Sequence, residues 1–211
     1  MNGKFITLEG IDGSGKSTQL AMLAAELRRR GYQVVTTREP GGTELGQALR
    51  AAFLETSGPV APMAELLSFA ADRAQHVEYL IKPEVAVGKV VISDRYADAT
   101  FAYQGAGRGF TEEQVNTVIE LATGGLKPDL TLFFDIPPAE AMTRMSVRTD
   151  EHRNRMDDET EEFYMRVRAA YLGIADREQE RFVVIDGYGS IDEIHERVMT
   201  VVLQRIEPNA Q

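Results

Sequence analysis

The chain has 211 residues, of which 43% are hydrophobic and 27% are charged. A chain of this size and composition fits one compact domain, which excludes a fibrous or disordered protein. The 33 acidic and 23 basic residues leave a net charge of −10, which argues against broad binding to nucleic acid or to anionic membranes. The absence of cysteine from the sequence excludes a disulfide framework and a thiolate metal site.

The expected location is the cytoplasm. The N-terminal residues lack the apolar segment of a signal peptide, and no apolar run approaches the ~20 residues that span a bilayer. His76, His152 and His195 lack metal-ligand spacing, so we expect them to be packed or solvated.

The predicted strands are short, unbroken apolar runs. They are expected at residues 4–9, 32–37, 89–93, 130–135 and 181–186. Strands of a parallel sheet read this way because helices cover both faces, whereas antiparallel strands with one wet face alternate apolar and polar residues.

Helices are predicted between these strands from apolar residues at helical spacing and from capping residues such as Thr111 and Ser190. The predicted helices cover residues 19–30, 63–81, 111–122, a stretch from 138 onward, 161–175 and 190–205. The repeated β-α order predicts a single three-layer α/β domain over residues 1–211, with a five-stranded parallel sheet and right-handed crossovers.

A polar segment near residues 144–158 interrupts this pattern. It contains Arg144, Arg148, Arg153 and Arg155 and has few apolar anchors. Such a segment buries little surface, so we expect it to be a mobile lid.

The motif Gly10-Ile11-Asp12-Gly13-Ser14-Gly15-Lys16-Ser17 lies between the first predicted strand and helix, and it matches the phosphate-binding P-loop pattern. Its glycines let backbone N–H groups converge on phosphate oxygens, and the helix N-terminus adds positive potential. We expect Lys16 to reach the β- and γ-phosphates of a nucleoside triphosphate and the Ser17 hydroxyl to ligate Mg²⁺.

A phosphate loop alone is compatible with a switch, a motor or a kinase. A GTP-binding switch would carry an Asn-Lys-x-Asp motif, and no asparagine in this chain is followed by lysine. The stretch Asp186-Gly187-Tyr188-Gly189 fits Asp-x-x-Gly but follows the last predicted strand, so we interpret it as a turn.

Asp94 and Arg95 follow the third predicted strand, at the sheet edge where open α/β sheets bind ligands. A carboxylate there can hold Mg²⁺, and a guanidinium can bind a phosphate, while the alternative is a turn in which the two residues pair. Asp135 and Asp186 also end strands, but neither has an arginine beside it, and a structural role is favoured for both.

Two further groups point to an anionic, planar ligand. Arg38 opens the loop Arg38-Glu39-Pro40-Gly41-Gly42-Thr43 after the second strand and is expected to hold an anion, a solvated arginine being the alternative. Phe69 and Arg73 lie four residues apart on one helical face, where a ring and a guanidinium can stack on and hydrogen-bond a flat base. The alternative for Phe69 is a core position.

These motifs, together with Tyr103-Gln104-Gly105, closely resemble the bacterial thymidylate kinase family of P-loop nucleoside monophosphate kinases. The phosphate loop is shared by many families, but the Arg-Glu-Pro-Gly-Gly-Thr, Asp-Arg-Tyr and Ala-Tyr-Gln-Gly motifs at these separations are specific to this one. The resemblance implies phosphorylation of dTMP to dTDP with Mg-ATP, in dTTP biosynthesis, by a homodimer formed through helix faces.

The resemblance also implies roles for individual residues. The expected ATP-binding residues are Gly10, Ile11, Asp12, Gly13, Ser14, Gly15, Lys16, Ser17 and Thr18. The expected dTMP-binding residues are Asp12, Arg38, Phe69, Arg73, Arg95, Thr100, Tyr103 and Gln104. The expected metal ligands are Ser17 and Asp94, and the expected catalytic residues are Lys16, Asp94, Arg95 and a lid arginine.

Within the pocket, the resemblance implies that Arg73 hydrogen-bonds the thymine edge while Phe69 stacks on the ring, with Thr100 and Gln104 completing the site. Tyr103 is expected to crowd the 2′ position and favour deoxyribose. Asp12 is expected near the sugar 3′-hydroxyl or the metal, and Arg38 and Arg95 are expected on the acceptor phosphate.

The family has two branches, with the catalytic arginine either in the phosphate loop, at the position of Gly13, or in the lid. Gly13 indicates the second branch, with Arg153 favoured and Arg148 and Arg155 next. An arginine finger contributes roughly 10³–10⁵ in rate, and a closed lid excludes water. Two alternatives stay open from the sequence: a kinase for another nucleotide or deoxynucleoside, and a nucleotide-dependent switch.

Overall fold

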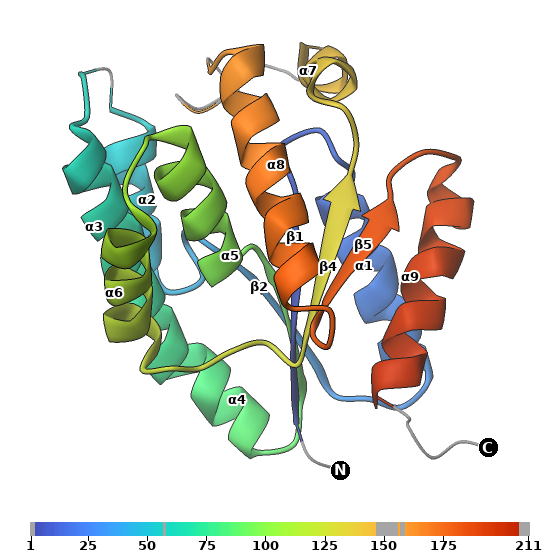
Figure 1. Ribbon diagram of the computed structural model, residues 1–211. Helices are drawn as coiled ribbons and strands as arrows, with labels where there is room; N and C mark the ends of the chain where they lie inside the picture. The colour runs from blue at the N-terminus through green and yellow to red at the C-terminus, as the bar shows by residue number, and fades with distance from the viewer. Residues whose placement is uncertain (1–2, 57, 147–155, 157–158, 207–211) are drawn as a thin grey trace.

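The computed structural model describes residues 3–56, 58–146, 156 and 159–206. Its centre is one 5-stranded parallel sheet (Figure 1). The strands are β1 (Lys4–Glu9), β2 (Val34–Arg38), β3 (Val90–Asp94), β4 (Leu130–Asp135) and β5 (Phe182–Asp186). Their order is β2-β3-β1-β4-β5, so β1 lies in the middle between β3 and β4.

Helices cover both faces of this sheet, which confirms the predicted three-layer fold (Figure 1). The α-helices are α1 (Lys16–Arg29), α2 (Glu44–Leu54), α3 (Pro62–His76), α4 (Lys82–Ala86), α5 (Ala97–Thr100), α6 (Glu112–Thr123), α7 (Pro138–Ser146), α8 (Glu161–Arg177) and α9 (Ile191–Ile206). Two π-helical segments, η1 (Val77–Ile81) and η2 (Phe101–Gly107), continue α3 and α5. Helices α1 and α9 cover one face, and α3, α5 and α8 cover the other, with α2 and α6 packed against α3.

The alternation of side chains along β1 explains the two layers. Ile6 and Leu8 are buried against Leu27 of α1 and Val198 of α9. Residues that alternate with them, such as Phe5, point to the opposite face, because successive side chains of a strand alternate. Burial of these apolar groups on both faces supplies the main stabilisation of the sheet.

The register of the strands positions the site. In β1 and β3, Leu8 is paired with Asp94, and in β2 and β3, Arg38 is paired with Asp94. The carboxyl ends of three neighbouring strands therefore meet at one edge, which is where parallel α/β sheets bind ligands.

The structure differs from the sequence prediction in several elements. Helix α1 begins at Lys16 rather than at residue 19, and the predicted helix 63–81 changes to a π-helical turn after His76. Helix α2 and the α5–η2 segment were not predicted. Thr43 caps α2 by accepting a hydrogen bond from the Gly46 amide, which is a local signal that the sequence contains.

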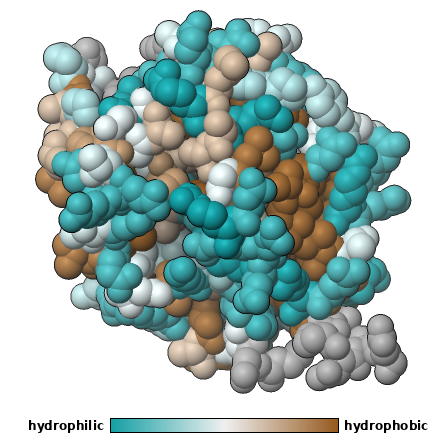
Figure 2. All heavy atoms as spheres, in the orientation of Figure 1, coloured by the Kyte–Doolittle hydropathy of each residue, from teal (hydrophilic) through white to brown (hydrophobic). Residues whose placement is uncertain are grey.

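The surface seen in Figure 2 is mostly hydrophilic, with apolar residues gathered between α8 and α9 over β4 and β5. Val184 of the edge strand β5 is among the exposed large apolar residues. Within the described part of the chain, no helix is both long and apolar enough to cross a bilayer.

Candidate active site

The phosphate loop joins β1 to α1 and has the backbone that its glycines allow. Gly10, Gly13 and Gly15 have φ angles of 140°, 82° and 93°, which lie in a region that side chains with a β-carbon rarely adopt. A β-carbon at residue 13 would lie 2.4 Å from the Ala141 carbonyl oxygen of α7. A side chain at position 13 would therefore require both a strained backbone angle and a shift of the loop or of α7.

Lys16 is buried at the first position of α1. Its Nζ donates to the carbonyl oxygens of Gly10 at 2.9 Å and Ile11 at 3.1 Å, so the ammonium lies beneath the loop. Burial and the nearby Arg95 guanidinium lower the pKa of Lys16. A cation held this way gains most from an anion placed over the loop.

Ser17 and Asp94 meet across the boundary between α1 and β3. The Ser17 Oγ donates to Asp94 Oδ2 at 3.0 Å. A hydroxyl and a carboxylate at hydrogen-bond distance are hard oxygen donors of the kind that Mg²⁺ takes, with waters and phosphate oxygens completing its shell. The donor set of these residues therefore fits the predicted ion.

Arg95 is the one residue other than glycine with a positive φ, 73°, in the described ranges of the chain. This turn after β3 brings its guanidinium to the phosphate loop, where Nη2 donates to Asp12 Oδ2 at 2.9 Å and to the Tyr103 hydroxyl at 3.1 Å. The same guanidinium lies 5.1 Å from the centre of the Tyr103 ring. Strained backbone of this kind costs about 1–3 kcal/mol and is found at functional sites.

The turn at Arg95 is held by Glu9, which is fully buried at the end of β1. Glu9 accepts hydrogen bonds from the Tyr96 amide and from the Tyr171 hydroxyl, both at 2.8 Å. Burial, with a smaller effect from Asp98, raises the pKa of Glu9 to about 8. The sequence analysis assigned no function to this residue.

A cavity of about 500 Å³ lies beside the phosphate loop. Every residue that the sequence predicted to bind dTMP lines this cavity, together with Ser17 and Asp94. The structure thus brings residues from β2, α3, the turn after β3, η2 and the phosphate loop into one site. Thr18 lies outside this set, exposed on the first turn of α1.

Arg73 spans the floor of the cavity and is almost completely buried. Its Nε donates to Glu39 Oε2 at 2.8 Å, its Nη1 to the Thr100 hydroxyl at 2.8 Å, and its Nη2 to the Tyr96 carbonyl at 2.9 Å. His76 completes this network, because its Nδ1 lies 2.8 Å from Glu39 Oε1. His76 is thus packed, one of the two environments expected for the histidines.

Phe69 lies one helical turn before Arg73 on α3, on the cavity wall. Its ring contacts Phe53 of α2 edge to face, with ring centres 4.9 Å apart. The ring is partly buried against the core, as the structural alternative expects, and it also lines the cavity; stacking on a base stays a prediction.

Helix α2 adds Arg50, a cavity residue that the sequence analysis missed. Its Nη1 donates to the Pro40 carbonyl at 3.3 Å. Burial, followed by the positive charges of Arg38 and Arg95, lowers the pKa of Arg50. Three guanidinium groups that line one cavity could together bind an anion. The Thr43 cap could have revealed α2 and hence this arginine.

The three favoured lid arginines, Arg148, Arg153 and Arg155, lie outside the described residues. The start of the predicted lid is helical, because α7 extends to Ser146, and Arg144 pairs with Glu140 one turn earlier in α7. At the other end of the lid, Met156 is described and lines the cavity.

A second cavity, of about 480 Å³, lies between α5, α6 and α8. Most of its charged residues form ion pairs, as in the contact between Arg181 Nη1 and Asp98 Oδ2 at 2.8 Å. None of the predicted site residues is among the described residues that line it. The chemistry is therefore concentrated in the first cavity.

Comparison with known proteins agrees with this geometry. Residues 8–198 match the thymidylate kinase family model. The chain is 48% identical over 202 residues to a thymidylate kinase of Synechococcus sp. (strain JA-3-3Ab), which covers 96% of each chain, and 45% identical to one of Neisseria gonorrhoeae (strain NCCP11945), which covers 96% of this chain and 97% of that one.

A crystal structure of thymidylate kinase from Ehrlichia chaffeensis superposes with a TM-score of 0.78 at 35% identity, covering 96% of this chain and 99% of the other. The resemblance stated from the motifs is thus confirmed over nearly the full length. The chain belongs to the thymidylate kinase family.

Proposed function

We propose that this chain transfers the γ-phosphoryl group of ATP to dTMP, giving ADP and dTDP. Membership of the thymidylate kinase family supports this activity. The observation that carries it is the direct link between a triphosphate-binding loop and a base-sized cavity. Two contacts make that link, from Ser17 to Asp94 at 3.0 Å and from Arg95 to Asp12 at 2.9 Å.

On the donor side, the loop amides and Lys16 bind the β- and γ-phosphates of ATP. Lys16 already lies under the loop, and its exchange of the Gly10 and Ile11 carbonyls for phosphate oxygens requires only a local movement. Ser17 and Asp94 hold Mg²⁺ or its waters. When bound, this ion neutralises charge on the phosphates.

On the acceptor side, Arg38, Arg50 and Arg95 bind the 5′-phosphate of dTMP. Their shared position on the cavity and the effect of Arg38 and Arg95 on the pKa of Arg50 support this assignment. Such an anion site requires no positive surface elsewhere, which suits a chain with a net charge of −10.

The thymine base lies against Phe69, with Arg73 and Gln104 on its polar edge and Thr100 orienting Arg73. Tyr103 lies beside the sugar, and its hydroxyl already shares Arg95 Nη2 with Asp12. Asp12 is then placed near the 3′-hydroxyl. Contacts from separate elements fix the acceptor in line with the donor, which is most of what a protein contributes to phosphoryl transfer.

The arginine that stabilises the transferring phosphoryl group comes from the lid, from Arg153, Arg148 or Arg155. The crowding of position 13 by Ala141 supports this branch, because the loop has no room for a side chain there. One domain over residues 1–211 with a lid near 144–158 is thus the proposed unit of activity. A reducing cytoplasmic location suits the cysteine-free chain.

We also propose that the active form is a homodimer. Helix α3 packs against both α2 and α6, and these helices leave Leu45 49%, Leu67 52% and Leu121 80% exposed. Large apolar side chains gathered on adjacent helices are typical of a protein interface.

The function is tested by coupled ADP release from Mg-ATP with dTMP, dUMP, dCMP, dGMP and AMP as separate acceptors. We expect dTMP to give the highest kcat/KM and dTDP to accumulate. Preference for a purine or another nucleotide would assign the chain to a different kinase. Release with none of the acceptors would favour a nucleotide-dependent switch and overturn the proposal.

A further inference from the structure

Gln104 of η2 has its side-chain amide held from behind by a buried carboxylate. Its Nε2 donates to Glu65 Oε1 at 2.8 Å, and both side chains are almost fully buried. Glu65 belongs to α3, the helix that also carries Phe69 and Arg73. Gln104 lines the substrate cavity, whereas Glu65 lies behind it.

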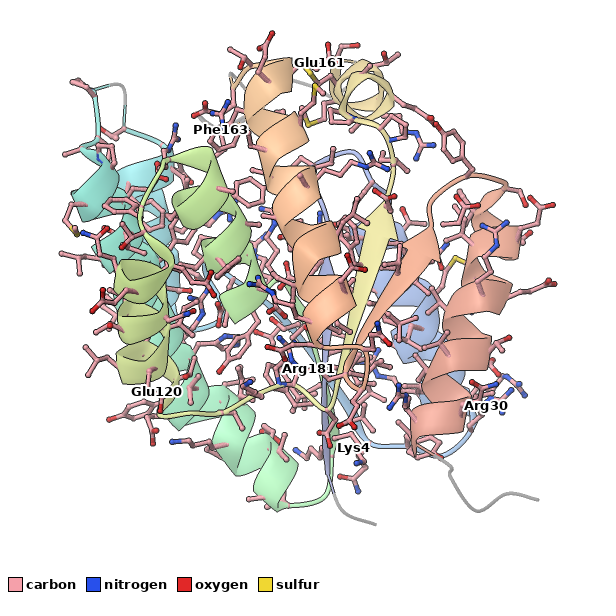
Figure 3. The ribbon with its side chains drawn as sticks, viewed as in Figure 1. Lys4, Arg30, Glu120, Glu161, Phe163 and Arg181 are labelled. Atoms are coloured by element: carbon pink, nitrogen blue, oxygen red, sulfur yellow. The ribbon has the colours of Figure 1, made fainter. Side chains whose placement is uncertain are left out.

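Glu65 is kept in place by Arg108. The Nε and Nη2 of Arg108 donate to Glu65 Oε1 and Oε2, each at 3.1 Å, which is the two-point geometry of a strong ion pair. The guanidinium also pairs with Glu159 at 2.6 Å and lies 5.0 Å from the centre of the Phe163 ring. Figure 3 shows Phe163 at the start of α8, on the side that faces the α5–η2 segment.

This arrangement fixes which amide atom of Gln104 meets the cavity. A carboxylate paired with arginine only accepts hydrogen bonds, so the donor Nε2 must face Glu65. If the Gln104 amide were flipped, its Oε1 would face the Glu65 carboxylate oxygen. Two buried acceptors would then meet without a hydrogen between them, which is unfavourable. Oε1 is therefore left to a ligand as an acceptor in a fixed position, while Nε2 keeps only its second N–H.

We propose that Glu65 determines the base specificity of the site by holding Gln104 as a hydrogen-bond acceptor. Thymine carries an N3–H donor on its pairing edge, beside O4, which suits an acceptor at Gln104 next to the donor Arg73. Cytosine carries an unprotonated N3 and an amino group in these places, so both contacts become mismatched. Glu65 touches no substrate atom and acts through Gln104. This inference rests on the proposed dTMP kinase activity.

The test is Glu65→Gln, which keeps the size of the side chain but lets it donate as well as accept. Gln104 can then present either amide atom. We expect the ratio of kcat/KM for dTMP to that for dCMP to fall about tenfold, through a higher dTMP KM and a lower dCMP KM, with the ATP KM unchanged. An unchanged ratio would overturn the proposal.

Two comparisons separate specificity from general damage. Glu159→Gln removes the same charge from the other carboxylate that pairs with Arg108, but it does not contact Gln104, so we expect it to leave the ratio unchanged. In a Gln104→Leu background, Glu65→Gln should alter the ratio no further, because the amide through which it acts is gone. A further fall in that background would mean that Glu65 acts by another route, and would contradict the proposal.

Thermal unfolding of each variant establishes that it is folded. If Glu65→Gln does not fold, Arg108→Gln gives a related test, since it removes the two hydrogen bonds by which Arg108 holds the Glu65 carboxylate against Gln104. We expect the same fall in ratio, and selectivity equal to that of the wild type would overturn the proposal. Absence of dTMP phosphorylation in the wild-type enzyme would instead contradict the proposed function itself.

Discussion

Arg73 illustrates how one side chain serves both the core and the site. Its guanidinium bonds Glu39, Thr100 and the Tyr96 backbone, yet it lines the cavity where the base is proposed to bind. A guanidinium locked by three partners reaches the ligand with its geometry already set. Pre-organisation of this kind reduces the entropy lost on binding.

Arg73→Ala is therefore expected to raise the dTMP KM about a hundredfold and the ATP KM by less than about threefold. It should also lower the free energy of unfolding by about 3–5 kcal/mol, because it leaves the Glu39 carboxylate buried without its arginine. Steady-state kinetics and urea unfolding measure the two effects. Equal changes in both KM values would contradict the base-reading role.

Arg50 provides a separate test of the phosphate site. We expect Arg50→Ala to raise the dTMP KM about tenfold or more, since a charge-assisted contact to the 5′-phosphate is lost. Thymidine, which has no phosphate, serves as the control ligand: its inhibition constant against dTMP should stay the same. A parallel weakening of thymidine would show that Arg50 acts on the nucleoside instead.

At the scale of elements, the end of β1 determines the turn that follows β3. Glu9 binds the Tyr96 amide, and the Arg95 amide donates to the Leu8 carbonyl at 2.9 Å. These two bonds keep Arg95 in its left-handed conformation. The central strand thus orients Arg95, which follows the neighbouring strand and is proposed to bind phosphate.

Glu9 also makes the stability of the fold depend on pH. Burial raises the pKa of the Glu9 carboxyl from its ordinary value of 4.5 to about 8. Between these two pH values the folded protein keeps a proton on Glu9 that the unfolded chain has released. The contribution of Glu9 to the free energy of unfolding is therefore fully present below about pH 4.5 and is lost as the pH rises towards 8.

Glu9→Gln cannot lose this proton. We expect the difference in unfolding free energy between Glu9→Gln and the wild type to shift in favour of the variant by about 2–4 kcal/mol from about pH 5 to about pH 8. Urea unfolding at both pH values measures this difference. A difference that does not change with pH would mean that Glu9 is ionised in the folded protein throughout the range.

The contact between the phosphate loop and α7 makes a second prediction at this scale. Gly13→Ala places a β-carbon 2.4 Å from the Ala141 oxygen, at a φ of 82°. We expect a loss of about 2–4 kcal/mol in stability and a higher ATP KM, because the loop amides move. Gly109→Ala is the matched control, with a φ of 85° and no atom within 4 Å of the new β-carbon. Equal effects on the ATP KM would exclude the α7 contact as the cause.

At the scale of the whole molecule, the proposed dimer can be tested by measuring its mass in solution. Light scattering at micromolar concentration should give twice the mass of the 23.4 kDa chain. Leu67→Glu, at an exposed position of α3, should lower the measured mass towards that of the monomer, because a charge replaces an apolar contact. Glu113→Lys is the control variant: it lies on the first turn of α6 and changes the charge without removing an apolar group, so it should keep the dimer mass. A wild-type mass equal to one chain would contradict the dimer.

The sequence predicted the sheet well because parallel strands are buried on both faces and appear as apolar runs. Helix α2 was missed for a tertiary reason. Gly46 weakens its local helix signal, but a β-carbon there would lie 2.2 Å from Asp72 Oδ1 of α3, so packing requires the glycine. The π-helical segments have no sequence period of their own, so η2 was also missed.

In the site, the residues that could be predicted stand close together along the chain, in short motifs. The supporting carboxylates Glu9, Glu39 and Glu65 could not be predicted, because their partners lie far away in sequence. Each is an ordinary acidic residue until the fold buries it beside an amide or a guanidinium. The resemblance to a family identified the ligand-facing residues and left these supports unseen.

The closeness of Gly13 to Ala141 couples the phosphate loop to α7. Helix α7 leads directly into the arginine-bearing segment, and its backbone abuts the loop that wraps the nucleotide tail. Any adjustment of that loop around its anion is passed on to α7 without an intervening side chain. A shift of the phosphate loop on nucleotide binding would therefore also require a shift of α7.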